Sequence, residues 1–137
     1  MKRIAVTATM ATVLSTAALA QSATPPEATH ALTSLPADAV TVTDYYKQNV
    51  YDPSETKIGE VADVLVDKDG RAVAVIVSAG GFLGAGEKDV AVPFSAVRRT
   101  QRDGKWYLVM NATKDALKAA PGYKYDKSKT QWMPDTK

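Results

Sequence analysis

The segment whose residue types most suggest chemistry is GGFLGAGEKDVAVP, from Gly80 to Pro93. Glycine-rich loops that end in lysine hold phosphate in the pattern G-x-x-x-x-G-K-[ST], between a strand and a helix. Here Gly81 and Gly86 have the outer spacing, but a glutamate precedes Lys88 and an aspartate follows it. Two carboxylates would repel a phosphate, and the next residues favour a strand over a helix. We therefore predict no nucleotide site and no cofactor.

The glycines of this segment are better explained by chain geometry, because glycine adopts backbone angles that other residues avoid. We interpret all four as a structural glycine loop between two strands: Gly80, Gly81, Gly84 and Gly86. Phe82 and Leu83 stand at its centre. Either they fold back and plug one end of the fold, which we favour, or they stay exposed as a contact point. Both residues are therefore candidate binding residues.

The segment DVLVDKDGRAV resembles a calcium-binding loop only superficially. An EF-hand loop needs acidic ligands at its first, third and fifth positions, glycine at the sixth and glutamate at the twelfth. With Gly70 at the sixth position, Leu65 and Ile76 occupy the first and twelfth. Two ligand positions are then apolar. The segment indicates a turn, and we predict no metal site.

Catalytic groups are scarce in this chain. It has no cysteine, which excludes disulfides and thiol chemistry, and its single histidine, His30, lies in a polar stretch near the N-terminus. Ser54, Ser78 and Ser95 show no nucleophile-elbow motif. Paired carboxylates could be chosen among the acidic residues, but no spacing selects a pair. We therefore predict no catalytic residue and do not expect an enzyme.

One basic cluster stands out, Arg98-Arg99-Thr100-Gln101-Arg102. It falls where we expect a loop or the end of a strand, and a solvated surface run is the favoured interpretation. The alternative is a docking patch for an acidic partner, so Arg98 and Arg99 are candidate binding residues.

The first twenty residues have the pattern of a secretory signal peptide. A positive Met1-Lys2-Arg3 precedes an uncharged run that ends in Ala18-Leu19-Ala20. Removing residues 1–20 takes the 17 basic residues to 15, equal to the 15 acidic ones. A neutral mature chain has no general attraction to nucleic acid or anionic lipid. We expect a periplasmic or secreted protein without stable membrane insertion and without a nucleic-acid partner.

The elements that would position these residues follow a leader at residues 21–40, rich in Ala, Ser, Thr and Pro, for which we expect flexibility. A domain is predicted at 41–125 and a polar C-terminal tail at 126–137. Within the domain, β-branched runs between turn signals predict four strands: Ile58–Val66, Arg71–Ser78, Lys88–Pro93 and Lys105–Met110. Thr113 caps one short helix. We predict an all-β fold, a small closed antiparallel β-barrel with one short C-terminal helix.

The stretch from Lys57 to Val97 strongly resembles the PRC-barrel domain. The resemblance rests on a G-x-[VI]-x-D-[VI] strand at Gly59–Val64, a D-x-x-G turn at Asp67–Gly70, and G-G-F-L-G-x-G-x-K-x-V-A-V-P from Gly80. With its flanks it covers roughly Val42 to Lys124, and it is closest to small stand-alone secreted proteins of proteobacteria. It implies a six-stranded barrel that acts as a docking module and carries no catalytic residues. Electron transfer and ribosome assembly, known for other members, do not transfer with the fold.

Two functions remain open at this stage. The first is a non-catalytic periplasmic binding or adaptor module that docks an unknown protein or envelope component. The alternative is a small-ligand or ion carrier that uses the barrel mouth near Phe82, Leu83 and Trp106. Homodimerisation is left open by the sequence.

Overall fold

The computed structural model describes residues 31–80 and 86–136 of the 137-residue chain. The contacts divide the chain into two units, Met1–Leu35 and Pro36–Lys137, and all regular structure in the described residues belongs to the second. The predicted signal peptide at residues 1–20 and the first half of the predicted leader lie outside the described residues. The same holds for Gly81, Phe82, Leu83 and Gly84.

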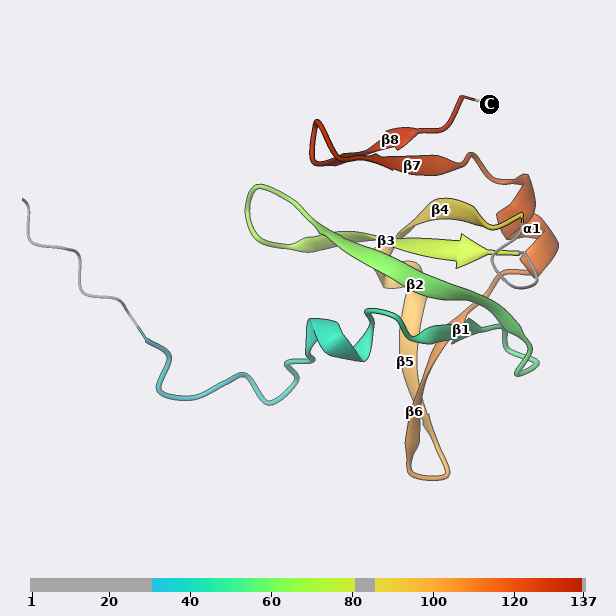
Figure 1. The fold of residues 1–137 in the computed structure, drawn as a ribbon. Coiled ribbons are helices and arrows are strands. Elements are labelled where there is room, and N and C mark those ends of the chain that lie inside the picture. Colours follow the sequence, from blue (N-terminus) through green and yellow to red (C-terminus); the bar gives the residue numbers. More distant parts are fainter. Residues whose placement is uncertain (1–30, 81–85, 137) are drawn as a thin grey trace, which may run out of the picture. The chain divides into compact units, whose positions relative to one another are not determined.

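Eight strands form one sheet in the order β5-β6-β1-β2-β3-β4-β7-β8 (Figure 1). The strands are β1 Asn49–Tyr51, β2 Lys57–Val66, β3 Ala72–Ala79, β4 Lys88–Pro93, β5 Val97–Arg102, β6 Lys105–Met110, β7 Tyr123–Asp126 and β8 Gln131–Pro134. Two short 3-10 helices, η1 Val42–Asp44 and η2 Phe94–Ala96, precede β1 and β5. The α-helix α1 spans Lys114–Ala119. The four predicted strands are confirmed as β2, β3, β4 and β6, with shifts of at most one residue at their ends.

Turn chemistry explains two of the hairpins. Between β2 and β3, a carboxylate oxygen of Asp67 accepts hydrogen bonds from the backbone N–H groups of Asp69 and Arg71, at 2.8 and 3.0 Å. Between β5 and β6, Asp103 and Gly104 have φ angles of 48° and 75°. Positive φ at both central residues suits a two-residue hairpin, because that turn follows the twist of its strands.

The sheet is not closed, so the predicted closed antiparallel barrel is wrong. A closed sheet would need β4 to pair with β5, but β4 ends at Pro93, which has no N–H to donate, and η2 then redirects the chain. The free side of β4 instead meets β7, where Asp89 is opposite Tyr123. The sheet is also mixed rather than purely antiparallel, because β1 pairs with β6 in parallel.

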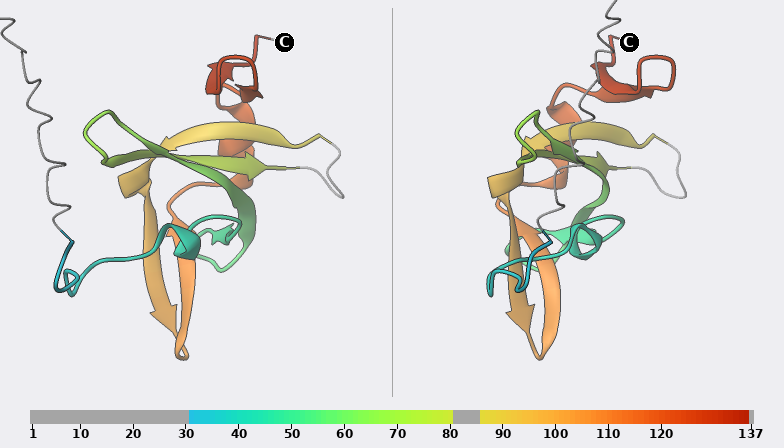
Figure 2. Two further views of the ribbon diagram at one scale, coloured as in Figure 1. Left: turned by 60° about the vertical axis from the view of Figure 1, so that its left-hand side comes forward. Right: turned by 90° about the vertical axis from the view of Figure 1, so that its left-hand side faces the viewer.

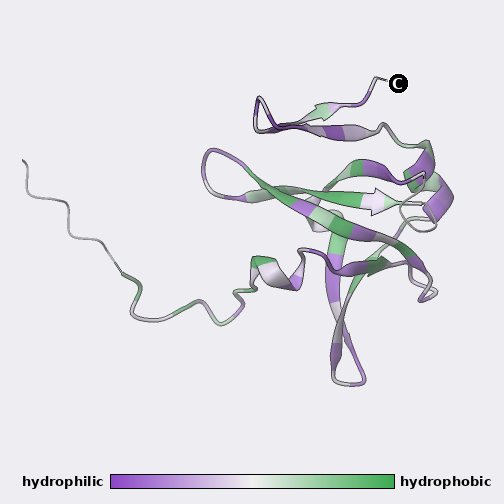
Figure 3. Cartoon of the chain, in the orientation of Figure 1, coloured by the Kyte–Doolittle hydropathy of each residue, from purple (hydrophilic) through white to green (hydrophobic). Residues whose placement is uncertain are grey.

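The core lies mainly on one face of the curved sheet. Its largest fully buried members are Val50, Ile58, Val61, Val75 and Val77. Figure 3 shows this apolar character along β3 and polar residues at the turn that precedes it. Residues of a strand alternate between faces, so Ile76 points to the other side from its two neighbours. Ile76 is nonetheless completely buried.

The C-terminal hairpin reaches this second face. The indole N–H of Trp132, on β8, donates a 2.8 Å hydrogen bond to a carboxylate oxygen of Asp63, and Asp63 is the cross-strand partner of Ile76. Trp132 also packs edge-on against Tyr125 of β7, with ring centroids 5.6 Å apart. We infer that β7 and β8 cover the face on which Ile76 lies.

The helix α1 is short and is not the last element of the fold, because β7 and β8 follow it. The side chain of Thr113 accepts a hydrogen bond from the backbone N–H of Ala116, which caps the helix. Leu117 is the buried residue of α1 and joins the core. The residues predicted as a polar tail contain β8.

Candidate docking surface

The β5–β6 hairpin starts in the core, and its turn extends beyond it. At its base, Val97, Leu108 and Met110 are buried in the core. Toward the turn β5 becomes polar, and Trp106 on β6 is 57% exposed. In every view the turn of this hairpin lies at the opposite end of the unit from β7 and β8 (Figures 1 and 2).

Arg99 and Trp106 lie together on one face of the hairpin. The guanidinium carbon of Arg99 is 4.3 Å from the centre of the Trp106 ring, a cation–π contact. The Nη2 nitrogen of the same guanidinium pairs with a carboxylate oxygen of Asp44 at 3.3 Å. The Arg99 side chain is 18% exposed, and its Nε is buried with no hydrogen-bond partner among the described residues. One polar atom is thus left unsatisfied beside an exposed tryptophan.

The segment that carries Asp44 is fixed to the domain. Asp44 is the last residue of η1, and its N–H donates to the side chain of Thr41 at 3.3 Å. The next residue, Tyr45, is buried and packs against Phe94 with ring centroids 4.9 Å apart. The Asp44 carboxylate is therefore held close to β5.

The opposite face of the hairpin carries Arg98, Thr100 and Arg102. Arg102 forms an ion pair with Glu55, in the loop between β1 and β2. Arg98 is exposed and forms no ion pair with any described residue. It borders an open hollow of about 480 Å³, whose further lining includes Pro53, Ser95, Ala96, Thr100 and Val109.

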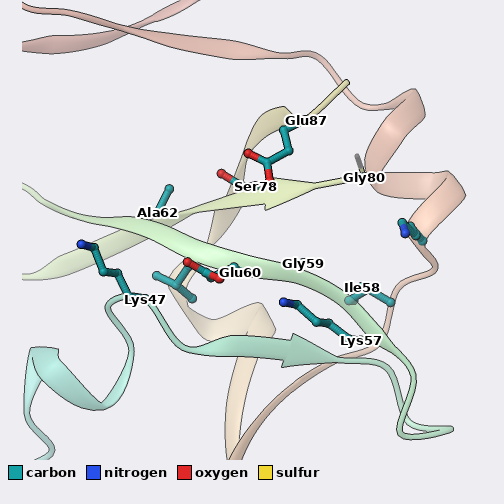
Figure 4. Close-up of a pocket in the computed structure, with 11 residues that line it drawn as sticks. Lys47, Lys57, Ile58, Gly59, Glu60, Ala62, Ser78, Gly80 and Glu87 are labelled. Atoms are coloured by element: carbon teal, nitrogen blue, oxygen red, sulfur yellow. The ribbon is translucent and has the colours of Figure 1, made fainter. Parts of the chain in front are cut away.

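A second hollow of about 430 Å³ lies beside β2 and β3 (Figure 4). Its charged lining mixes both signs: Lys47, Lys57, Lys114, Glu60 and Glu87. Ser78 also lines it, and the Ser78 hydroxyl donates a hydrogen bond to the Asp89 carboxylate. No cluster of three or more metal-ligating side chains occurs in the described part of the chain. This arrangement suits a small polar ligand of mixed charge better than a metal ion.

Three of the predicted site residues meet on one hairpin. Arg98 and Arg99 lie on β5 and Trp106 on β6. Gly80 borders the second hollow instead, and Trp106 is not part of the lining of that hollow. Gly80 and Gly86 have φ angles of 82° and 74°, which residues other than glycine rarely adopt.

Sequence reasoning missed Asp44 and Glu55, the acidic partners of the arginines. Each ion pair joins segments that no local pattern connects. The hairpin signal Asp103-Gly104 could have shown that the arginine cluster is a strand, because a strand that follows such a turn needs a partner before it.

Comparison with known families decides where the fold belongs. The family model described as the PRC-barrel domain matches residues 37–117, more than half of the chain. The chain belongs to the PRC-barrel family. The match to the PRC-barrel domain spans β1 to β6 and most of α1, and it stops before β7 and β8. The hairpin with Trp132 thus lies outside the family match.

No curated protein matched the chain. Within the described residues, no helix of this PRC-barrel protein has the length and apolar character needed to cross a membrane.

Proposed function

We propose that this PRC-barrel protein is a non-catalytic binding or adaptor module that docks a protein or envelope component in the periplasm or outside the cell. The observation that supports docking is the β5–β6 hairpin, which carries the exposed Trp106 in contact with Arg99 on one face and the exposed Arg98 on the other. Tryptophan and arginine are the residue types most enriched where interfaces derive their binding energy. Because the Arg99 guanidinium already contacts the Trp106 ring, the ring loses little further conformational freedom on binding.

Cross-linking in the producing cell tests this proposal. The full-length tagged protein is compared with Trp106→Ala and with Val66→Ala, which removes a side chain that is 62% exposed on β2. We expect the wild-type protein and Val66→Ala to retain the same specific partner and Trp106→Ala to lose it. Equal retention by Trp106→Ala would remove the hairpin from the docking surface.

The location is tested separately. We expect the protein in the periplasmic or culture fraction, with a mature N-terminus at Gln21. Recovery of uncleaved protein from the cytoplasm would contradict that part of the proposal.

A small-ligand carrier is the second candidate, and the hollow of about 430 Å³ beside Gly80 favours it. A thermal-shift screen of small polar metabolites separates the two functions. A ligand at 100 times its dissociation constant should stabilise the protein by about 2.7 kcal/mol. A specific stabiliser that Lys57→Ala abolishes would support the carrier, and no response to any compound would leave docking as the function.

A further inference from the structure

The strand β5 has one unpaired edge. It is the first strand in the sheet order, and all six of its residues pair with β6 on the other side. No strand in the described part of the chain occupies its outer edge. The alternate N–H and C=O groups along that edge are therefore available to a further strand.

The charges along β5 differ in whether the fold already neutralises them. Arg99 is paired with Asp44 and Arg102 with Glu55, whereas Arg98 has no acidic partner among the described residues. Arg98 also borders the open hollow of about 480 Å³. A carboxylate that approached the β5 edge could pair with the Arg98 guanidinium, which has an open hollow beside it.

We propose that β5 binds an extended acidic segment of a partner protein as an added strand, with a carboxylate of that segment paired to Arg98. This inference rests on the proposed docking function and specifies its mode. Strand addition derives affinity from backbone hydrogen bonds and specificity from alternate side chains. Because side chains alternate at ~3.3 Å per residue, acidic residues at every second position lie on the face that carries Arg98.

A second copy of this chain is the less suitable occupant of the edge. Pairing two β5 strands would bring the unneutralised Arg98 of each copy onto one short ladder, and like charges across strands are destabilising. The same charges attract an acidic segment. The edge therefore discriminates against self-association and in favour of an acidic partner.

Two measurements test the inference. The probe is a fluorescein-labelled peptide of alternating Thr and Glu, about eight residues long to span β5, and the control peptide alternates Thr and Lys. Fluorescence anisotropy is measured with the mature protein and with its Arg98→Ala variant. The control variant is Arg71→Ala, which removes an exposed arginine in the β2–β3 turn. Amide hydrogen exchange of β5 is then measured with and without the acidic peptide.

We expect the acidic peptide to bind and the lysine peptide not to bind. Arg98→Ala should weaken binding roughly tenfold while Arg71→Ala leaves it unchanged, and alternate β5 amides should exchange more slowly in the complex. Both variants should melt at the wild-type temperature, since neither side chain is buried.

Three results would overturn the inference. Acidic-peptide binding without slower β5 exchange would exclude strand addition, and equal binding of both peptides would exclude charge recognition. If the acidic peptide does not bind, or if the protein self-associates through β5 instead, then β5 does not bind an acidic segment of a partner. In each case Trp106-dependent capture of a partner would leave the docking function standing, so the two proposals fail separately.

Discussion

Gly59→Ala tests how closely β2 and β3 approach one another. A Cβ at position 59 would lie 2.6 Å from Cγ1 of Val77 and 2.8 Å from the backbone oxygen of Ser78. Carbon atoms in contact prefer ~3.5–4.0 Å, so the added methyl group overlaps its neighbours by about 1 Å. Gly59 is buried, and one of the two neighbours is backbone, which cannot rotate away.

The size of the effect follows from these contacts. Overpacking of a well-packed core costs about 1–3 kcal/mol, and moving Val77 off its preferred rotamer adds about 1 kcal/mol. Alanine also lowers the entropy of the unfolded chain, which offsets about 0.4–1 kcal/mol of this destabilisation. The free energy of unfolding should fall by about 2 kcal/mol, which lowers the melting temperature of a domain of this size by about 10 °C.

Urea denaturation followed by circular dichroism measures this change, with an unchanged dependence on urea indicating that the folded state is retained. Gly70→Ala is the matched control, because Gly70 has a φ of 78° but no atom within 4 Å of the added Cβ. Gly70→Ala should lower the free energy of unfolding by about 1 kcal/mol through backbone strain alone.

Combining Gly59→Ala with Val77→Ala isolates the side-chain contact. The double variant should be less destabilised than the sum of the single variants by about 1 kcal/mol, because the new methyl group enters the space that Val77 leaves. If Gly59→Ala were no more destabilising than Gly70→Ala, or if the two changes were additive, the close approach would not explain why glycine stands there.

Three further predictions concern the C-terminal third of the chain. Trp132→Phe keeps an aromatic ring but removes the hydrogen bond to Asp63, and it should lower the free energy of unfolding by about 1 kcal/mol in urea titrations. Thr113→Ala removes the cap of α1 and should cost about 1 kcal/mol in the same assay. The hydrogen bonds from Ser128 hold the pKa of Asp126 below its ordinary 3.8, so Ser128→Ala should raise that pKa toward 3.8 in a carboxyl NMR titration.

The sign of the pH effect at Asp126 follows from the lowered pKa. The stabilisation from its ionised form is fully present above about pH 3.8 and is lost as the pH falls through the lowered pKa of the folded state. An unshifted Asp126 titration in Ser128→Ala would contradict this explanation. Wild-type stability of Trp132→Phe or of Thr113→Ala would likewise remove the hydrogen bond concerned from the stabilising contacts.

The strands found from the sequence are those whose local pattern matches their burial. Lys88–Pro93 and Lys105–Met110 were predicted to the residue. In contrast, β5 was missed because its sequence is polar, and it is polar because the hairpin extends beyond the core. A local apolar pattern cannot report a strand of which Val97 is the only buried residue.

Local sequence patterns could not predict the open sheet or the C-terminal hairpin, for another reason. Both depend on contacts between distant parts of the chain, such as that of Trp132 with Asp63. Likewise, Arg99 and Trp106 were nominated separately, and only the β5–β6 register brings them together. Composition identified the residue types of the candidate docking surface, and topology determined which of them share a face.

The parallel pairing of β1 with β6 has a consequence for how this domain folds. Val50 is aligned with Leu108, 58 positions later in the chain, whereas β2, β3 and β4 join through neighbouring segments. The β1–β2–β3–β4 meander can thus form early, because β1 also pairs with the neighbouring β2, while the parallel pairing of β1 with β6 must wait until β6 has been synthesised. We expect the joining of the arginine-bearing hairpin to β1 to be the later step of folding.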